Sequence, residues 1–181
     1  GVSAVQIKMK ESGDFWNDGS LPLMARKDES GRMQTLFDHL HHAADYAAGF
    51  ESQYADIASM AAVLHDFGKA QRRFQRYLLN GEGRRGDVIH AWQGAFAVND
   101  LPLPQDHKPA ARLVKEILEL VIPSHHGDLP DCIGDTGMKI FFEDFSEQKK
   151  TNGKYAYEEV KTHEGELDLD IDERLRQSSI D

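Results

Sequence analysis

The stretch AVLHDFGKA, residues 62–70, places two ionisable side chains directly after an apolar run. These are His65 and Asp66, and Gly68 follows two residues later. Burying adjacent ionisable groups without partners costs several kcal/mol, and metal coordination is one way to offset that cost. Imidazole nitrogen and carboxylate oxygen suit zinc, iron, nickel, manganese and related ions. The stretch therefore predicts a helix that ends, near the glycine, at a metal-binding pair.

Apolar residues recur at helical spacing on both sides of this stretch. Thr35, with Asp38 three residues later, predicts a helix start, and Asn80-Gly81 predicts a stop. The chain shows no strong alternation of apolar and polar residues that would indicate a strand. We therefore expect an all-α fold, a compact helical bundle, with its main helices at about 35–50, 53–67, 70–79, 88–99 and 108–122, and weaker ones within 136–148 and 154–163.

The length of 181 residues fits one ordinary domain with a sizeable core. Residues 1–34 carry turn signals and little periodicity, so we interpret them as an irregular entry segment. Residues 35–163 make up the expected domain. Residues 164–181 begin with six acidic residues within ten and no basic one, which is typical of a solvated tail or of a cut-off part of the domain.

The composition is that of a soluble globular protein, with 40% hydrophobic and 29% charged residues. No apolar run reaches the length of a membrane span, so we expect no membrane partner. Cys132 is the only cysteine, which excludes an internal disulfide and a Cys-based zinc cluster and suits the cytoplasm. The net charge of −10 argues against a general nucleic-acid coat protein. A local basic strip, at Lys69, Arg72, Arg73 and Arg76, can hold a polyanion or be a solvated helix face.

Further histidines are spaced along the chain in positions that a bundle can bring to one centre. His39 lies in the helix before the His-Asp pair, His90 begins the next helix but one, and His125-His126 follow the fifth helix. A single histidine on an apolar face is usually structural, and we assign that role to His41, His42, His107 and His163. The spaced set differs, because its order is hard to produce by chance.

This order resembles the HD superfamily of metal phosphohydrolases, and its details are most similar to the HD nuclease domain of the type I CRISPR helicase–nuclease. Four segments carry the resemblance: ARKDESGRMQTLFDHLHHAADYA at 25–47, LHDFGKAQRRFQRYL at 64–78, VIHAWQGAFA at 88–97 and PSHHGDLPD at 123–131.

The resemblance implies two adjacent metal sites. One ion would be held by His39, His65 and Asp66, and the other by Asp66, His90, His125 and His126. The family usually adds an aspartate from a late helix to the first site, and nothing after residue 131 matches that motif. The candidates by composition alone are Asp144, Asp168, Asp170 and Asp172.

The implied activity is hydrolysis of single-stranded DNA by a metal-dependent nuclease in CRISPR interference. Asp66 and Lys69 would be catalytic, and Lys69, Arg72, Arg73 and Arg76 would contact the strand. The expected cofactors are one or two divalent ions, with Mn, Ni, Co, Fe, Zn and Mg as candidates. The chain has no P-loop, so the implied partners are a separate helicase domain or subunit and a CRISPR effector complex.

Two other functions fit the same residues. One is an HD phosphohydrolase acting on nucleotides or cyclic nucleotides. The other is a catalytically impaired metal-binding interaction module, which the missing aspartate would explain.

Overall fold

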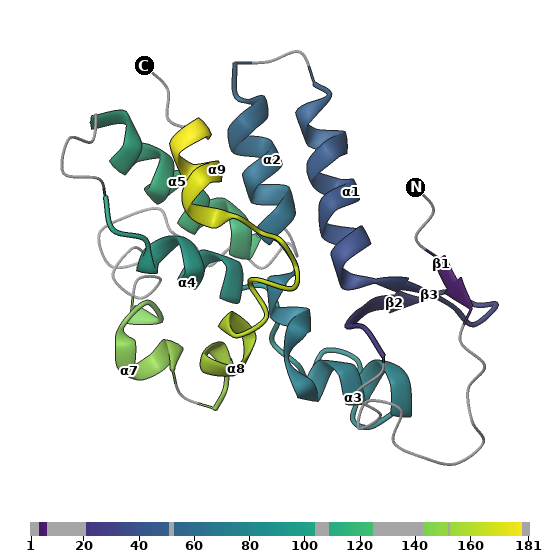
Figure 1. Cartoon of the computed structure of the whole chain (residues 1–181). Coiled ribbons are helices and arrows are strands. Elements are labelled where there is room, and N and C mark those ends of the chain that lie inside the picture. Colours follow the sequence, from purple (N-terminus) through teal and green to yellow (C-terminus); the bar gives the residue numbers. More distant parts are fainter. Residues whose placement is uncertain are drawn as a thin grey trace.

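A computed structural model of the chain describes residues 4–6, 21–50, 53–103, 109–124, 143–151 and 153–178. This part is mostly helical (Figure 1), which agrees with the expected helical fold, but it is not all-α because it also contains a small β-sheet. Two antiparallel helices stand side by side, and three more pack beside the second of them. The pair is α1 (Leu36–Ala48) and α2 (Ala55–Leu64), and the neighbours are α4 (Gln93–Asp100), α5 (Pro109–Ser124) and α9 (Ile171–Ser178).

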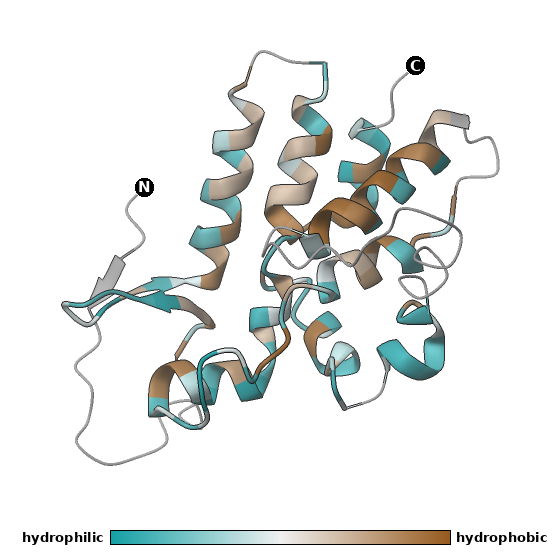
Figure 2. Cartoon of the chain, turned by 180° about the vertical axis from the view of Figure 1, so that it is seen from behind, coloured by the Kyte–Doolittle hydropathy of each residue, from teal (hydrophilic) through white to brown (hydrophobic). Residues whose placement is uncertain are grey.

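Four more helical segments of the described part lie at the other end of the molecule (Figure 1). They are the 3-10 helix η2 (Phe67–Ala70), α3 (Arg72–Asn80), α7 (Glu147–Lys150) and α8 (Tyr157–Lys161). Hydrophobic residues concentrate where α2 and α5 meet (Figure 2). The core there is built from residues such as Val63, Leu64, Leu118 and Ile122, each 0–1% exposed. No helix in the described ranges is both long and apolar enough to cross a membrane.

The predicted start of α1 is confirmed. The Thr35 side chain accepts a hydrogen bond from the backbone N–H of Asp38 at 3.2 Å, which satisfies a donor of the first turn. The predicted stop after Asn80 is confirmed as well, because Gly81 ends α3 with φ +71, a left-handed conformation that favours glycine.

The interpretation of residues 1–34 as irregular is wrong for their described part. A three-stranded antiparallel sheet, in the order β1-β3-β2, is formed there by β1 (Ala4–Gln6), β2 (Met24–Lys27) and β3 (Arg32–Thr35). The turn between β2 and β3 is closed by Asp28, whose carboxylate accepts from the backbone N–H groups of Ser30 and Arg32. Met24 and Met33 are fully buried beneath the sheet. The hairpin is thus tied to the core.

The expected helix boundaries around the His-Asp pair need correction. α2 ends at Leu64, and Gly68 lies within η2, where it allows a close backbone approach instead of capping α2. A Cβ at Gly68 would lie 2.3 Å from the carbonyl oxygen of His90. His90 itself precedes α4, which begins only at Gln93. The loop before α4 is therefore pressed against η2.

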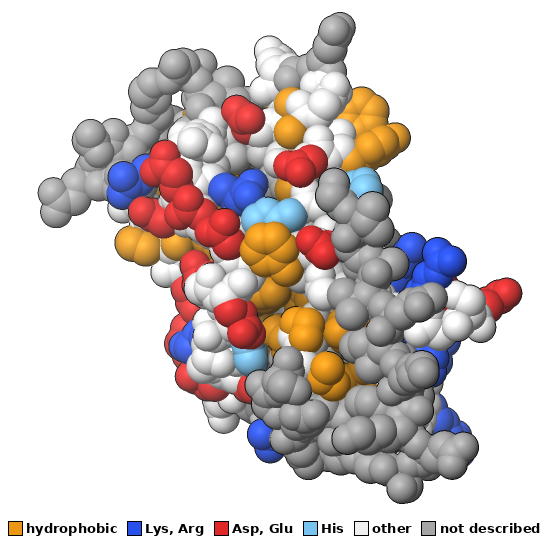
Figure 3. Space-filling model, turned by 45° about the vertical axis from the view of Figure 1, so that its right-hand side comes forward, with side chains coloured by type: hydrophobic (Ala, Val, Ile, Leu, Met, Phe, Trp, Pro, Cys, Tyr) orange, Lys and Arg blue, Asp and Glu red, His pale blue; other side chains and the backbone are white. Residues whose placement is uncertain are grey.

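The expectation of a solvated acidic tail is also wrong for the described residues 164–178. Four apolar residues lie between the acidic ones, and each of them is buried: Leu167, Leu169, Ile171 and Leu175. The first three alternate with acidic residues, and the last follows at helical spacing. Their acidic neighbours are exposed, and acidic side chains gather on the face drawn in Figure 3. The carbonyl oxygen of Leu167 accepts from Nε2 of His41 at 2.8 Å, so this segment is fixed to α1 and covers the core.

Ion pairs of the buried Lys150 with two more exposed carboxylates join the end of α4 to α7. Nζ of Lys150, a residue only 1% exposed, lies 2.5 Å from Oδ1 of Asp100 and 2.7 Å from a carboxylate oxygen of Glu147. The hydroxyl of Tyr157 donates to the other oxygen of Asp100 at 2.7 Å. These contacts connect α4, α7 and the start of α8. Of the two weaker helices expected near the C-terminus, the one within 154–163 is present as α8. The short α7 overlaps the other expected range, 136–148, only at residues 147–148, and residues 136–142 lie outside the described residues.

Candidate metal centre

The carboxylate of Asp66 is the centre of the site, and Asp66 is 4% exposed. Its Oδ2 lies 2.8 Å from Nε2 of His39, 3.2 Å from Nε2 of His65 and 3.2 Å from Nζ of Lys69. Its Oδ1 lies 3.8 Å from Nε2 of His90. These partners come from α1, the end of α2, η2 and the loop before α4, so the bundle brings residues 51 positions apart to one carboxylate.

The other nitrogen of two of these imidazoles is occupied by the backbone. Nδ1 of His65 faces the carbonyl oxygen of Ala62, and Nδ1 of His90 lies 3.2 Å from the carbonyl oxygen of Val88. A carbonyl oxygen only accepts, so Nδ1 must carry the hydrogen in both rings. A hydrogen bond of this kind, from the ring nitrogen that does not face the metal to a backbone carbonyl, commonly fixes the tautomer of a metal-binding histidine and leaves Nε2 as the ligand atom.

This donor set fits a divalent cation. A neutral ring with its hydrogen on Nδ1 turns the Nε2 lone pair toward Asp66, and two acceptors at about 3 Å repel each other unless a proton or a cation lies between them. His39, His65 and Asp66 offer ligand atoms that all lie within 4.8 Å of one another, so this group could hold a metal ion. Nitrogen and oxygen ligands without thiolate suit several transition ions.

The charge on His65 responds to the same carboxylate. Burial of the ring opposes protonation, but the hydrogen bond and negative charge of Asp66 outweigh burial and raise the pKa of His65. The raised pKa means that the carboxylate of Asp66 favours the protonated form of His65. A metal ion must displace that proton, so its binding weakens as the pH falls.

The ligand set expected from the sequence is brought together in part. His39, His65, Asp66 and His90 converge, with His90 on the Oδ1 side of the carboxylate. His125 and His126 lie outside the described residues.

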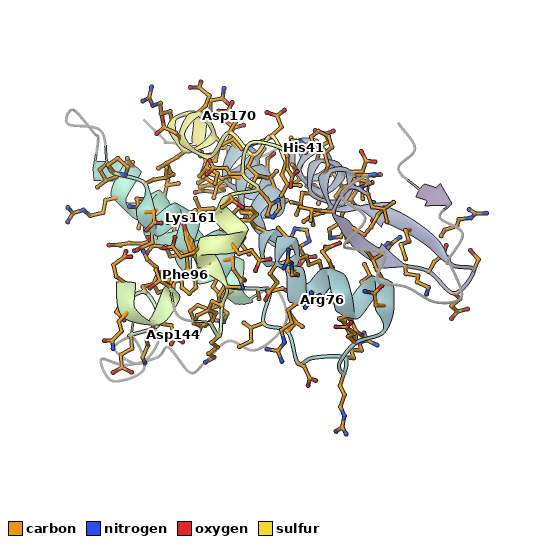
Figure 4. All side chains as sticks on the ribbon, turned by 60° about the horizontal axis from the view of Figure 1, so that its bottom comes forward. His41, Arg76, Phe96, Asp144, Lys161 and Asp170 are labelled. Carbon is orange, nitrogen blue, oxygen red and sulfur yellow. The ribbon has the colours of Figure 1, made fainter. Side chains whose placement is uncertain are left out.

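The four candidates for a further aspartate do not join the group. Among the described residues, the potential metal-binding group contains no acidic side chain besides Asp66. Two of the candidates lie far apart in Figure 4, with Asp144 just before α7 and Asp170 just before α9.

Two contacts from the N-terminal hairpin hold the site, and the sequence interpretation missed both. Oε1 of Gln34, on β3, lies 3.2 Å from Nδ1 of His39. Nζ of Lys69 donates to the carbonyl oxygen of Ala25 at 3.1 Å, where the register of β2 with β3 shifts. The available signal was the Ser30-Gly31 turn between short apolar stretches, a hairpin pattern that we had interpreted only as irregular.

Two residues of α3, Phe74 and Gln75, pack against the site or the hairpin that supports it. Phe74 is 6% exposed, and its ring lies 5.4 Å from the His90 ring and 5.4 Å from Nζ of Lys69. Gln75 is fully buried and exchanges hydrogen bonds with the backbone of Met24 at 2.9 Å in both directions. These contacts fasten α3 to the hairpin and to the site.

The basic strip continues from the site along α3. Arg72 and Arg73 are exposed, and Arg76, labelled in Figure 4, is half-buried. The N-terminus of α3 is held by Glu159, whose carboxylate accepts from the backbone N–H of Arg72 at 2.5 Å. The strip is thus presented on a fixed helix that starts three residues after Lys69.

Comparison of the chain with models of known protein families gives no match, and comparison with curated proteins gives none either. The interpretation of the site therefore depends on its geometry and on the sequence pattern.

Proposed function

We propose that this chain is a metal-dependent phosphodiesterase of the HD type that cuts single-stranded DNA in CRISPR interference. The observation that supports the proposal most is the convergence of His39, His65, His90 and Lys69 on the carboxylate of Asp66. A purely structural carboxylate needs far fewer partners. The arrangement is what a phosphate-hydrolysing metal centre requires: imidazole ligands, a carboxylate able to bridge and a nearby cation.

Asp66 and the histidines would hold one ion on the Oδ2 side, and His90 with Asp66 would contribute to a second on the Oδ1 side. Bound divalent ions polarise a phosphate oxygen and lower the pKa of a coordinated water from about 15.7 towards 7. The chain's own residues then have separate tasks. Asp66 would hold the ions in place, and the hydrogen bonds of the imidazoles to the backbone would keep the rings in a binding orientation. The Lys69 ammonium would offset negative charge on the phosphate.

A polymeric substrate is favoured over a free nucleotide by the strip that leads away from the site. Arg72 and Arg73 can contact successive phosphates of a strand whose scissile phosphate lies near Lys69. A single strand can bend into a recessed centre, whereas a duplex presents its phosphates on a rigid cylinder. The proposed partners are a helicase domain or subunit that supplies the strand and a CRISPR effector complex.

The test is a cleavage assay with the metal-stripped chain, to which Mn²⁺, Ni²⁺ or Co²⁺ is added with a single-stranded oligonucleotide. We expect cutting with little sequence preference, much slower cutting of duplex, and inhibition by salt because phosphate contacts are electrostatic. Lys69→Gln should lower the rate by about 10-fold or more. Lys161→Gln, which alters an exposed lysine paired with Glu158, is the matched control.

Two outcomes would replace the proposal. If the chain hydrolyses nucleotides or cyclic nucleotides far better than any strand, it is a small-substrate phosphohydrolase. If it binds metal tightly and hydrolyses neither class of substrate, the impaired interaction module is the better description.

A further inference from the structure

A cavity of about 430 Å³ opens beside the metal centre, on the side of His90. Its walls come from the loop before α4, the end of α5 and the segments next to α7 and α8. His90 belongs both to this cavity and to the group around Asp66. The lining that matters most is Val88, His90, Trp92, Asp144, Lys154 and Tyr155. A ligand seated here would therefore lie next to a phosphate held at the centre.

The wall of the cavity is aromatic and firmly supported. The rings of Trp92 and Tyr155 lie 6.2 Å apart, and the Trp92 ring is backed by Phe145 at 5.9 Å. Tyr155 is 2% exposed, and its carbonyl oxygen accepts from Nε2 of Gln93 at 2.7 Å. Fixed aromatic faces of this kind bind planar rings with little loss of side-chain freedom.

Two charged side chains complete the lining. Nζ of the exposed Lys154 lies 5.1 Å from the centre of the Tyr155 ring. Asp144 interacts with the Tyr155 hydroxyl and lies 3.8 Å from Nζ of Lys149. A carboxylate has about four acceptor positions, so Asp144 can also accept N–H groups from a ligand. A bare phosphate would gain nothing from the aromatic wall and would be repelled by Asp144.

A second cavity gives the contrast. It is about 270 Å³, lies on the side of His65, and is otherwise lined by aliphatic residues: Ala43, Ala61, Ala62, Val121 and Ile122. Among the described residues, its lining offers neither an aromatic face nor a charged side chain other than His65. The two sides of the centre therefore differ, and only the His90 side suits a planar ring with polar edges.

We propose that the cavity lined by Trp92, Lys154 and Tyr155 binds the nucleobase of a nucleotide next to the scissile phosphate. The proposal builds on the proposed function, since it takes the phosphate to lie at the metal centre. The base stacks on Trp92, its amino N–H groups reach Asp144, and the Lys154 ammonium contacts a base carbonyl or the adjoining phosphate. Recognition of the strand is then by base stacking at the centre and by phosphate contacts along α3.

The first experiment measures base binding without catalysis. Trp92 and Trp16 are the two tryptophans of the chain, and Trp16 lies outside the described residues. In a Trp16→Phe variant, the fluorescence therefore reports Trp92 alone. Metal-free protein is titrated with 2′-deoxyadenosine and, separately, with 2-deoxyribose 5-phosphate. We expect a saturable change with the nucleoside and none with the sugar phosphate. No change with the nucleoside would overturn the proposal.

The second experiment measures cleavage with Mn²⁺ of an ordinary oligonucleotide and of one built from abasic nucleotides. Trp92→Leu should lower kcat/KM for the ordinary strand by about 10-fold or more and leave the abasic strand unaffected. Lys154→Ala, at an exposed position, is a second variant in case Trp92→Leu fails to fold, and it should weaken deoxynucleotide binding. If wild type and variants cut both strands equally, base binding is wrong while the nuclease stands. If no strand is cut, the proposed function fails, and the fluorescence titration alone decides the cavity.

Discussion

Gly68→Ala is the substitution for which the structure gives the clearest consequence. A Cβ at Gly68 would lie 2.1 Å from Oε1 of Gln93, 2.3 Å from the carbonyl oxygen of His90 and 2.5 Å from Cα of His90. Real Cβ contacts are essentially never under 3.0 Å, so the His90 backbone must retreat by about 0.7 Å. The Gln93 side chain cannot simply rotate away, because its Nε2 donates to the carbonyl oxygens of Ile89 and Tyr155.

Overpacking a core typically costs about 1–3 kcal/mol. We expect a loss of stability at the upper end of this range, about 2–3 kcal/mol, because two of the three atoms that the Cβ would meet belong to the backbone of His90. For a chain of this size, each kcal/mol lowers the midpoint of thermal unfolding by about 2–4 °C. Gly68→Ala should therefore lower it by about 4–12 °C. Metal affinity should fall as well, because coordination distances tolerate only about 0.2 Å and His90 is displaced by more than that.

The assay is thermal unfolding followed by circular dichroism, with and without added Mn²⁺. Gly153→Ala is the matched control, since a Cβ there meets nothing within 4 Å. It should leave stability unchanged or raise it slightly by restricting the unfolded chain. If Gly68→Ala unfolds at the same temperature as the wild type, the close contact between η2 and the loop of His90 is not present in solution.

Three further predictions concern stability and DNA binding. Lys150→Met should lower the free energy of unfolding by about 1–2 kcal/mol at neutral pH, because it removes the partner of Asp100. Burial raises the pKa of Asp100, but its hydrogen bonds to Lys150 and Tyr157 outweigh burial and hold the pKa below its usual value. The extra stability of the wild type over the variant is therefore present above about pH 4 and is lost as the pH falls through the folded-state pKa of Asp100. Urea unfolding at several pH values measures this difference. Leu169→Ala, at a fully buried position, should cost about 2–5 kcal/mol by the same assay. Arg72→Glu with Arg73→Glu should weaken single-stranded DNA binding and its salt dependence, measured by fluorescence anisotropy, with metal content unchanged.

Each of these has its own control. Lys149→Met changes a more exposed neighbour of Lys150 and should show little loss and no such pH dependence. Leu113→Ala, at a 57% exposed position, should change stability by at most about 0.5 kcal/mol. Arg112→Glu with Arg176→Glu makes the same charge change on α5 and α9 and should leave DNA binding largely intact. Equal effects of a variant and its control would contradict the corresponding prediction.

Local patterns in the sequence were enough to predict most of the main helices approximately, although not α9. Thr35 and Gly81 mark helix ends through their own backbone preferences, and these positions are confirmed. The His65-Asp66 pair could be found from its place after an apolar run, whereas its grouping with His39 came from the resemblance to the HD superfamily. The grouping of these three as potential ligands is matched by their geometry.

The features that the sequence interpretation missed depend on contacts between distant segments. The hairpin is short, and it supports the site through two contacts with distant segments. Gln34 contacts His39 of α1, and the carbonyl oxygen of Ala25 accepts from Lys69 of η2. The acidic run hides Leu167 and Leu169 because charge dominates its composition. Their burial depends on packing against segments far away in the sequence, and the backbone of Leu167 is bound by His41 of α1. The close approach of Gly68 to His90 joins positions 22 residues apart, which no local propensity predicts.

Metal binding to Asp66 tests the central claim most directly. The metal-stripped chain, its Asp66→Asn variant and an Asp45→Asn control at an exposed position of α1 are titrated with Mn²⁺ by calorimetry at neutral pH. Circular dichroism checks that all three are folded. The wild type and the control should bind one or two ions with the same affinity. Asp66→Asn should bind at least about 10-fold more weakly, as losses around metal sites commonly do. Equal binding by a folded Asp66→Asn variant would contradict the account.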